Sequence, residues 1–312
     1  MLQRVLVVYN SKSSHHAAIQ DEILGPVRRL RGALVGKFEV RHESLERNVQ
    51  ELIPLINEGD LVLVAGGDGT ATLALNALVR SGKRATLAVF GYGNLNDIAG
   101  MLGITREMGV VGVWQRFLAG NVHEIYPLEV TVNGRLWRYA PCYVTLGLLA
   151  ESATMMETQE VRQKLRMGKQ SRIFSLRMAI KWYWRNRKRN FLPAKMILNG
   201  QKIGDGKRVT DYLAVNSPVV AGMMKGGDWY RQPEKFGSTV QSLGKFWKMV
   251  KFGLRSVRKG IPLTETMEDT IKFGAPSEVE IQAEGEYQRL ADVEKIVVRK
   301  SARGVRVVLG GE

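Results

Sequence analysis

The sequence predicts two domains: an α/β domain on a doubly wound parallel sheet, followed by a mainly antiparallel β-sandwich domain. Over the first hundred residues, short apolar runs alternate with segments of helical periodicity. Beyond about residue 125, β-rich runs instead flank Asn-Gly dipeptides, which favour tight hairpins. A chain of 312 residues is long enough for two domains. We therefore predict an α/β domain over residues 1–124 and a β-rich domain over residues 125–302.

The first domain is predicted from its alternating elements, which follow the order of βαβ units. In chain order they are the strand Val5–Tyr9, a helix near His15–Leu30, a strand around Phe38–Arg41, a helix at Leu45–Asn57, the strand Leu61–Ala65, a helix that starts with Ala71–Leu78 and ends near Ser81-Gly82, and the strand Thr86–Phe90. In a doubly wound sheet, ligands bind at the carboxyl ends of the strands. Asn10 and the residues after Ala65 fall at these ends.

The second domain is predicted from hairpins and further strands. The predicted strands are Leu128–Val132 and Leu136–Tyr139 around Asn133-Gly134, Met196–Leu198 and Gln201–Ile203 around Asn199-Gly200, and then Val279–Gln282, Ile296–Arg299 and Val305–Leu309. One or two helices interrupt this β-rich region.

The segment Gly66–Thr70, Gly-Gly-Asp-Gly-Thr, joins a predicted buried strand to a predicted helix. A glycine-rich turn at a helix start directs backbone N–H groups at one point, which suits a phosphate group. The acid in this turn, Asp68, would repel phosphate unless a cation lies between them or it takes a proton from a nucleophile. The segment thus indicates Mg–nucleotide chemistry. The simpler alternative is a tight β-to-α turn with Asp68 as the helix N-cap.

A second glycine-rich turn follows the strand Thr86–Phe90, and it reads Gly-Tyr-Gly-Asn-Leu-Asn-Asp over Gly91–Asp97. Together with Gly66–Thr70 and the late Glu-Gly-Glu of residues 284–286, it resembles the diacylglycerol kinase catalytic-domain family. That family includes bacterial lipid kinases, sphingosine kinases and ceramide kinases, and NAD kinases resemble it more distantly. The order and spacing of the motifs match over nearly the whole chain.

The resemblance implies ATP and Mg²⁺ as cofactors, with no metal beyond Mg–ATP. It implies Asp68, Glu284 and Glu286 as catalytic residues, with Glu284 as general base and Glu286 orienting it or Asp68. It also implies that a C-terminal strand, at about 303–312, completes the first domain. The residues implied in nucleotide binding are Asn10, Ser44, Gly66, Gly67, Asp68, Gly69, Thr70, Asn94, Asn96 and Asp97.

Four departures from the family pattern indicate a divergent member with altered substrate or reduced activity. The opening Asn-Pro-x-Ser-Gly is replaced by Asn-Ser-Lys-Ser-Ser at residues 10–14. Asn94 stands where the family has Thr, and Glu284 stands where it has Asp. Phe236-Gly237 replaces an Asp-Gly that helps to bind a structural Mg²⁺. An ordinary acidic hairpin end remains the alternative for residues 284–286.

The net charge of +16 and a pI near 10.0 indicate a polyanionic partner, either nucleic acid or an anionic membrane. The segments Val161–Leu192 and Lys245–Phe252 mix Lys and Arg with aromatic residues, including Trp182 and Trp184. Such helices bind anionic lipid surfaces, although a solvated basic face is the simpler interpretation. The expected partners are a lipid substrate and an anionic membrane, without nucleic acid, and a homodimer is left open.

The sequence has a single cysteine, no signal peptide and no long apolar span, so we expect a cytoplasmic, peripherally membrane-associated protein. The leading hypothesis is an ATP-dependent lipid kinase that transfers the γ-phosphate to a hydroxyl of a membrane lipid such as diacylglycerol. The alternatives are a small-molecule kinase similar to NAD kinase, a weakened relative that binds nucleotide or anionic lipid, and a nucleic-acid-binding module.

Overall fold

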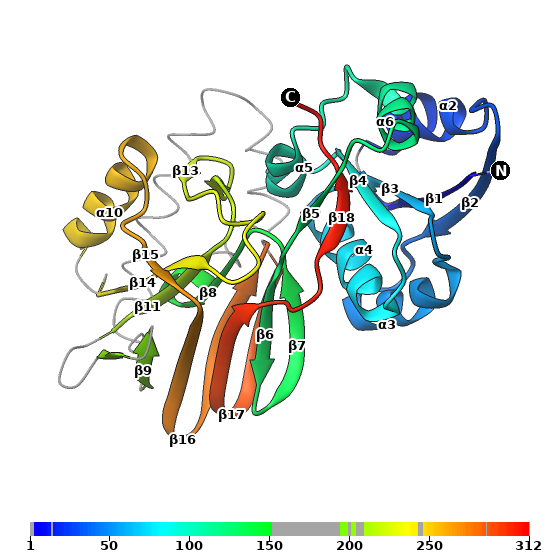
Figure 1. Cartoon of the computed structure of the whole chain (residues 1–312). Coiled ribbons are helices and arrows are strands. Elements are labelled where there is room, and N and C mark those ends of the chain that lie inside the picture. Colours follow the sequence, from blue (N-terminus) through cyan, green and yellow to red (C-terminus); the bar gives the residue numbers. More distant parts are fainter. Residues whose placement is uncertain are drawn as a thin grey trace.

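The computed structural model describes residues 3–13, 15–151, 194–198, 201–203, 209–242, 246–284 and 286–311. The basic segment Val161–Leu192, Ser14, the turn Asn199-Gly200 and Gly285 lie outside the described residues. Two separate sheets organise the chain, one in each domain (Figure 1). The predicted fold class, an α/β domain followed by a mainly antiparallel β domain, is confirmed.

The first domain contains a six-stranded sheet in the order β2-β1-β3-β4-β18-β5. The bounds are β1 Gln3–Tyr9, β2 Ala33–Glu39, β3 Leu61–Gly66, β4 Thr86–Gly91, β5 Val122–Ile125 and β18 Val305–Val308. All pairs are parallel except β18 with β5. Every residue of β3 is buried, as expected for a central parallel strand covered on both faces. The strand before the Gly66–Thr70 turn therefore lies in the middle of the sheet.

The helix predicted near His15–Leu30 is present without a gap over residues 16–27. Its middle turn is π-helical (Gln20–Leu24), between α1 (His16–Ile19) and α2 (Gly25–Val27). Helix α3 (Leu45–Leu52) ends before Pro54, and a 3₁₀ turn follows it. The remaining helices are α4 (Asp68–Ser81), α5 (Asp97–Leu102) and α6 (Gly109–Leu118).

The strand predicted around Phe38–Arg41 is wrong in its bounds, because β2 covers Ala33–Glu39. β2 is an edge strand that pairs only with β1, ending with Glu39 opposite Tyr9. Only Phe38 in this strand is buried, so its sequence lacks the continuous apolar run that marks β3.

The second domain is built on a ten-stranded sheet whose main path is β15-β14-β11-β8-β16-β17-β6-β7. All of its described pairs are antiparallel. The bounds are β6 Leu128–Val132, β7 Arg135–Ala140, β8 Tyr143–Gly147, β9 Ala194–Leu198, β10 Gln201–Ile203, β11 Asp211–Val215, β14 Phe236–Gln241, β15 Thr264–Thr266, β16 Glu268–Ala283 and β17 Glu286–Lys300. The small pair β12 (Val219–Val220) and β13 (Met224–Lys225) and the helix α10 (Phe246–Arg258) complete the domain.

The chain crosses between the two sheets twice, and the two crossovers lie together. The first runs from the end of β5 to β6, and the second runs from the end of β17 to β18. The Ser301 N–H donates to the Pro127 carbonyl at 2.9 Å. The buried Lys300 ammonium donates to the Tyr126 and Trp229 carbonyls, both at 2.8 Å, and to the Asn216 side chain. These bonds fix the two crossovers to each other.

Candidate active site

Two glycine-rich turns meet at the carboxyl ends of β3 and β4. The Tyr92 N–H donates to the Gly66 carbonyl at 2.8 Å. A Cβ on Gly93 would lie 2.6 Å from the Cα of Gly67, closer than such contacts allow. Position 93 therefore requires glycine, and a Cβ on Gly67 would be a tight contact at 3.1 Å from the Gly93 Cα. Sequence analysis placed these turns one βα unit apart, and the fold brings them into contact.

The second turn is closed by Asn96, which takes the left-handed conformation with φ of 54°. Its side chain accepts a hydrogen bond from the Gly93 N–H at 2.6 Å and donates to the Gly93 carbonyl at 3.0 Å. Both amide atoms of Asn96 are thereby engaged within the turn. Asn94, between them, is exposed. In this structure Asn96 shapes the turn, and Asn94 is the residue presented to solvent.

Helix α4 starts at Asp68, and its N-cap is Gly67. The alternative that made Asp68 the N-cap is therefore wrong, because the carboxylate lies in the first helical turn. No side chain caps this helix start. Thr70 is buried, and its side chain packs where a Cβ on Gly66 would be, at 2.6 Å from the Thr70 hydroxyl oxygen. The start of α4 thus has N–H groups without a side-chain cap and a positive dipole end.

Asp68 and Asp97 link the first turn of α4 to α5 and to the second domain. Asp68 accepts a hydrogen bond from the Ile98 N–H at 3.0 Å, and buried Asp97 accepts one from the Gly222 N–H at 2.7 Å. Burial raises the pKa of Asp68 from its usual value. Burial, reinforced by the charge of Asp68, raises the pKa of Asp97 to about 6. The two carboxylates are therefore close enough to hinder each other's ionisation.

Glu284 is a buried carboxyl group at the end of β16, with 4% of its surface exposed. Its Oε1 accepts hydrogen bonds from the Cys142 N–H at 2.7 Å and the Tyr143 N–H at 3.0 Å. Its Oε2 is buried, and no described residue hydrogen-bonds to it. Burial, together with the charges of Asp68 and Asp97, raises the pKa of Glu284 well above its usual value. Glu284 has φ of 52°, so it leaves the strand in a turn conformation that is uncommon for its residue type.

Glu286 begins β17 and reaches across to the start of α4. A Cβ on Gly69 would lie 2.6 Å from the Glu286 Oε1, so this glycine makes room for the carboxylate. The other oxygen, Oε2, forms an ion pair with Arg138 Nη1 at 3.2 Å. Arg138 is 8% exposed, and its Nε has no hydrogen-bond partner. The carboxylate of Glu286 is thus held between Arg138 of the second domain and Gly69 of the first.

Sequence analysis missed Arg138 and Asn76. Asn76 lies in the middle of α4, where its side chain donates to the Tyr139 carbonyl at 2.8 Å and accepts from the Tyr139 N–H at 2.9 Å. These two bonds join α4 to strand β7 of the second domain. A polar residue within the apolar run Ala71–Leu78 was the available signal for Asn76. No comparable signal marked Arg138, which is one of many basic residues in a basic chain.

The outlying predicted residues make local contacts. The Asn10 side chain, just after β1, accepts from the Lys12 N–H at 2.9 Å. Ser44 is the N-cap of α3 and accepts from the Arg47 N–H at 3.4 Å. Within the described part of the chain, no hydrogen bond of either side chain reaches the two glycine-rich turns. Their part in nucleotide binding stays a prediction.

The donor set fits Mg–ATP better than a dedicated metal cage. Within the described ranges, no three histidine, cysteine or carboxylate side chains converge as metal ligands. Phe236, at the position of the family's metal-binding Asp, is a fully buried core residue. Mg²⁺ in kinases is bound by one or two carboxylates, substrate phosphates and water. The start of α4 would hold phosphates through the N–H groups of Asp68, Gly69 and Thr70, and the Asp68 carboxylate lies in the same helical turn.

Comparison with known proteins agrees with this geometry. Residues 4–130 match the diacylglycerol kinase catalytic domain model. Over 88 residues, the chain is 36% identical to a diacylglycerol kinase of Bacillus subtilis (strain 168). This alignment covers 26% of the chain and 29% of that relative, so the chain spans less than a third of the relative's length.

Solved structures share the fold over nearly the whole chain. A diacylglycerol kinase structure from Bacillus anthracis str. Sterne has a TM-score of 0.65 at 15% identity, and another chain from that organism has 0.66 at 17%. Each comparison covers 98% of this chain and 97% of the other. At such identities the likeness concerns the two-domain fold. The sequence match over residues 4–130 supports assignment of this part of the chain to the diacylglycerol kinase catalytic-domain family.

Proposed function

We propose that the protein is an ATP-dependent kinase that phosphorylates a hydroxyl group of a membrane lipid such as diacylglycerol. The observation that supports this most directly is the position of Glu284. Its Oε2 is buried without a hydrogen-bond partner among the described residues, and burial, together with the charge of Asp68 in the first turn of α4, raises its pKa. A phosphate-binding helix start and a buried proton acceptor are the two parts that phosphoryl transfer to an alcohol needs.

Each residue has a defined part in this proposal. Mg–ATP supplies the phosphoryl group. The N–H groups at the start of α4 hold its phosphates, and Gly67 and Gly93 keep side chains away from them. Glu284 accepts the proton of the acceptor hydroxyl on Oε2, while the hydroxyl oxygen forms the new P–O bond and ADP leaves. Burial raises the pKa of Glu284, which makes its carboxylate a stronger proton acceptor than an exposed one.

Helix α10 supports a lipid acceptor. This helix has no acidic residue, and Trp247 is 76% exposed while Leu254 is 56% exposed. Lys248, Lys251 and Arg255 are also exposed on it. Exposed Trp and Leu among cations suit the headgroup region of an anionic membrane, where each cation adds about 1 kcal/mol. Among the residues that the structure describes, no helix has the length and apolar character needed to cross a bilayer.

The proposal is tested by supplying labelled ATP with diacylglycerol in anionic vesicles, with a total lipid extract, and with NAD. We expect a labelled phospholipid. Glu284→Gln should lower turnover by about 10²-fold or more and leave ATP affinity nearly unchanged, because it removes only the proton acceptor. Glu278→Gln, an exposed carboxylate on the same strand, is the control. Labelled NADP would instead establish the NAD kinase alternative, and no product with any acceptor would establish the non-catalytic one.

A further inference from the structure

A second candidate site lies at the opposite end of α4 from the glycine-rich turns. It is a pocket of about 340 Å³ between the end of α4, the start of β4, β5 and the crossover into β18. Helix α4 has 14 residues. With a rise of 1.5 Å per residue, its ends are about 21 Å apart. This pocket is therefore separate from the candidate active site. Its volume is in the range of small-molecule sites.

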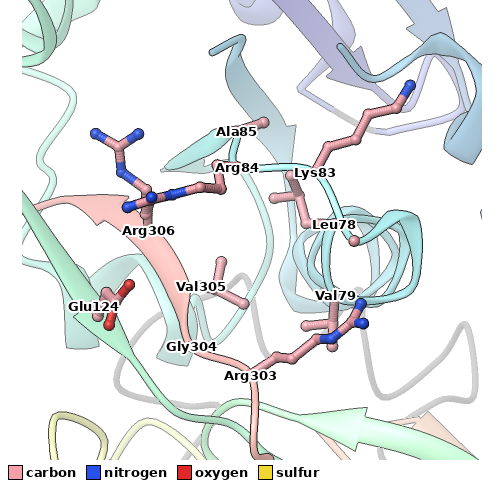
Figure 2. A pocket seen from close by; sticks show the side chains of 11 residues that line it. Leu78, Val79, Lys83, Arg84, Ala85, Glu124, Arg303, Gly304, Val305 and Arg306 are labelled. Atoms are coloured by element: carbon pink, nitrogen blue, oxygen red, sulfur yellow. The ribbon is translucent and has the colours of Figure 1, made fainter. Parts of the chain in front are cut away.

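The pocket is lined by four basic side chains and one carboxylate. The basic residues are Lys83, Arg84, Arg303 and Arg306, and the carboxylate is Glu124. Figure 2 shows Arg84 and Arg306 on one side, with Arg303 across the pocket near the end of α4 and Lys83 directed away. The floor between them is apolar and includes Leu78, Val79 and Val305. A ring of cations over an apolar floor suits an anionic ligand with a small non-polar part.

Among the residues that the structure describes, the positive charge of the pocket is not neutralised by ion pairs. Arg306 lies opposite Glu124 in the β18–β5 register, but the Glu124 carboxylate accepts a hydrogen bond from the Tyr126 hydroxyl at 2.9 Å. Among the described residues, none of the three arginines forms an ion pair. Lys83 donates to the Ile56 carbonyl at 2.5 Å, which directs its ammonium away from the pocket.

The C-terminal end of α4 carries partial negative charge, which is a structural reason for cations here, but this charge is too small to neutralise them. A helix C-terminus carries about half of an elementary negative charge, and cations there contribute about 0.3–1 kcal/mol. One carboxylate and half a charge face the three arginines, because Lys83 is directed away. The excess is about 1.5 positive charges on a pocket of small-molecule size. Arginine also suits phosphate in particular, because its planar fork donates two parallel hydrogen bonds.

We propose that this pocket binds a small molecule carrying a phosphate monoester, held by Arg84, Arg303 and Arg306. The ligand joins the turn after α4, through Arg84, to the crossover into β18 and to β18 itself, through Arg303 and Arg306. Binding therefore stabilises the protein against unfolding, by mass action on the folded state. The phosphate is either that of a soluble metabolite or the exposed headgroup of a lipid.

The test compares the double variant Arg84→Gln/Arg306→Gln with the control Arg28→Gln/Arg29→Gln, which removes two exposed arginines elsewhere on the first domain. Calorimetric titration with glycerol 3-phosphate, and co-sedimentation with vesicles containing phosphatidic acid, are done at fixed ionic strength. We expect the double variant to bind at least tenfold more weakly than the wild type and the control to bind normally. Loss with glycerol 3-phosphate assigns a soluble ligand, and loss with vesicles alone assigns a lipid headgroup.

Because the start of α4 is also expected to bind phosphate, crystals soaked in selenate locate the anion by its anomalous signal. Selenate between Arg84 and Arg306 supports the proposal. Selenate found only at the start of α4, or equal loss of binding in both double variants, overturns it. Arg303→Gln, an exposed single substitution on the crossover, repeats the measurement if the double variant does not fold.

Discussion

The contact between Gly69 and Glu286 provides a sharp test of the candidate active site. Replacing Gly69 with Ala adds a single methyl group and changes no charge. That Cβ would lie 2.6 Å from the Glu286 Oε1, so the carboxylate must move by about 0.4–0.8 Å to reach the 3.0–3.4 Å of tight real contacts. The movement strains the ion pair with Arg138, whose 3.2 Å distance fixes the other oxygen.

The expected result is a loss of activity without a loss of stability. A misplacement of 1 Å in a catalytic group can cost about 10²-fold, so we expect turnover to fall by about 10-fold to 100-fold. The helix gains up to about 1 kcal/mol from Ala over Gly, and a partly exposed ion pair is worth no more than about 1 kcal/mol. The free energy of unfolding should therefore change by less than about 1 kcal/mol.

The assay is initial rate of lipid phosphorylation, with thermal unfolding measured in parallel. Gly100→Ala is the matched control, because a Cβ there meets nothing within 4 Å. In the double variant Gly69→Ala/Glu286→Ala, the second substitution should add little further loss if both act through the same carboxylate. Full turnover in Gly69→Ala, or simple additivity in the double variant, would refute the role given to Glu286.

Three further predictions concern Asp68, α10 and Asp97. Asp68→Asn should lower turnover by about 10²-fold or more. The unfolding temperature should not change, because the amide oxygen still accepts a hydrogen bond from the Ile98 N–H. Substantial remaining turnover would exclude metal or proton chemistry at Asp68. Trp247→Ala should weaken binding to anionic vesicles and leave ATP affinity unchanged, whereas Leu118→Ala, an exposed apolar control on α6, should bind vesicles normally. Vesicle binding that does not change with salt concentration or with the fraction of anionic lipid would contradict an electrostatic contribution to docking. The pKa of Asp97 is about 6 in the folded state and about 4 in the unfolded state, so its contribution to the free energy of unfolding falls as pH rises from about 4 to about 6. Urea unfolding at several pH values should show that Asp97→Asn removes this slope. Identical pH profiles for the variant and the wild type would disprove the prediction.

The sequence predicted the parts of the fold that depend on local pattern. The fully buried run of β3 and the glycines after it predicted a strand, a turn and a helix, and the structure has all three. The long strands β16 and β17 were predicted only in their apolar pieces, Val279–Gln282 and Ile296–Arg299. Their remaining residues mix exposed and buried positions without a continuous apolar run, so pairing with neighbouring strands decides their extent.

The contacts that assemble the candidate site could not be predicted from local sequence patterns. The pairing of Asn76 with Tyr139 spans 63 residues, and that of Arg138 with Glu286 spans 148. Such contacts depend on how the two sheets are placed, which no local spacing encodes. The glycine-rich motifs indicated where the site would form. They did not reveal that both side-chain amide atoms of Asn96 form hydrogen bonds with Gly93, or that Glu284 is buried.

The position of β18 between β4 and β5 has a consequence for how the protein folds during synthesis. β5 pairs with β18 alone, and β18 leaves the ribosome after the whole second domain. Until then the growing chain carries an unpaired β4 edge, the kind of edge that recruits other strands. A chain cut before Val305 would keep this edge permanently and lose the anchor of β5. Such a truncation should aggregate, even though it removes no residue of the glycine-rich turns.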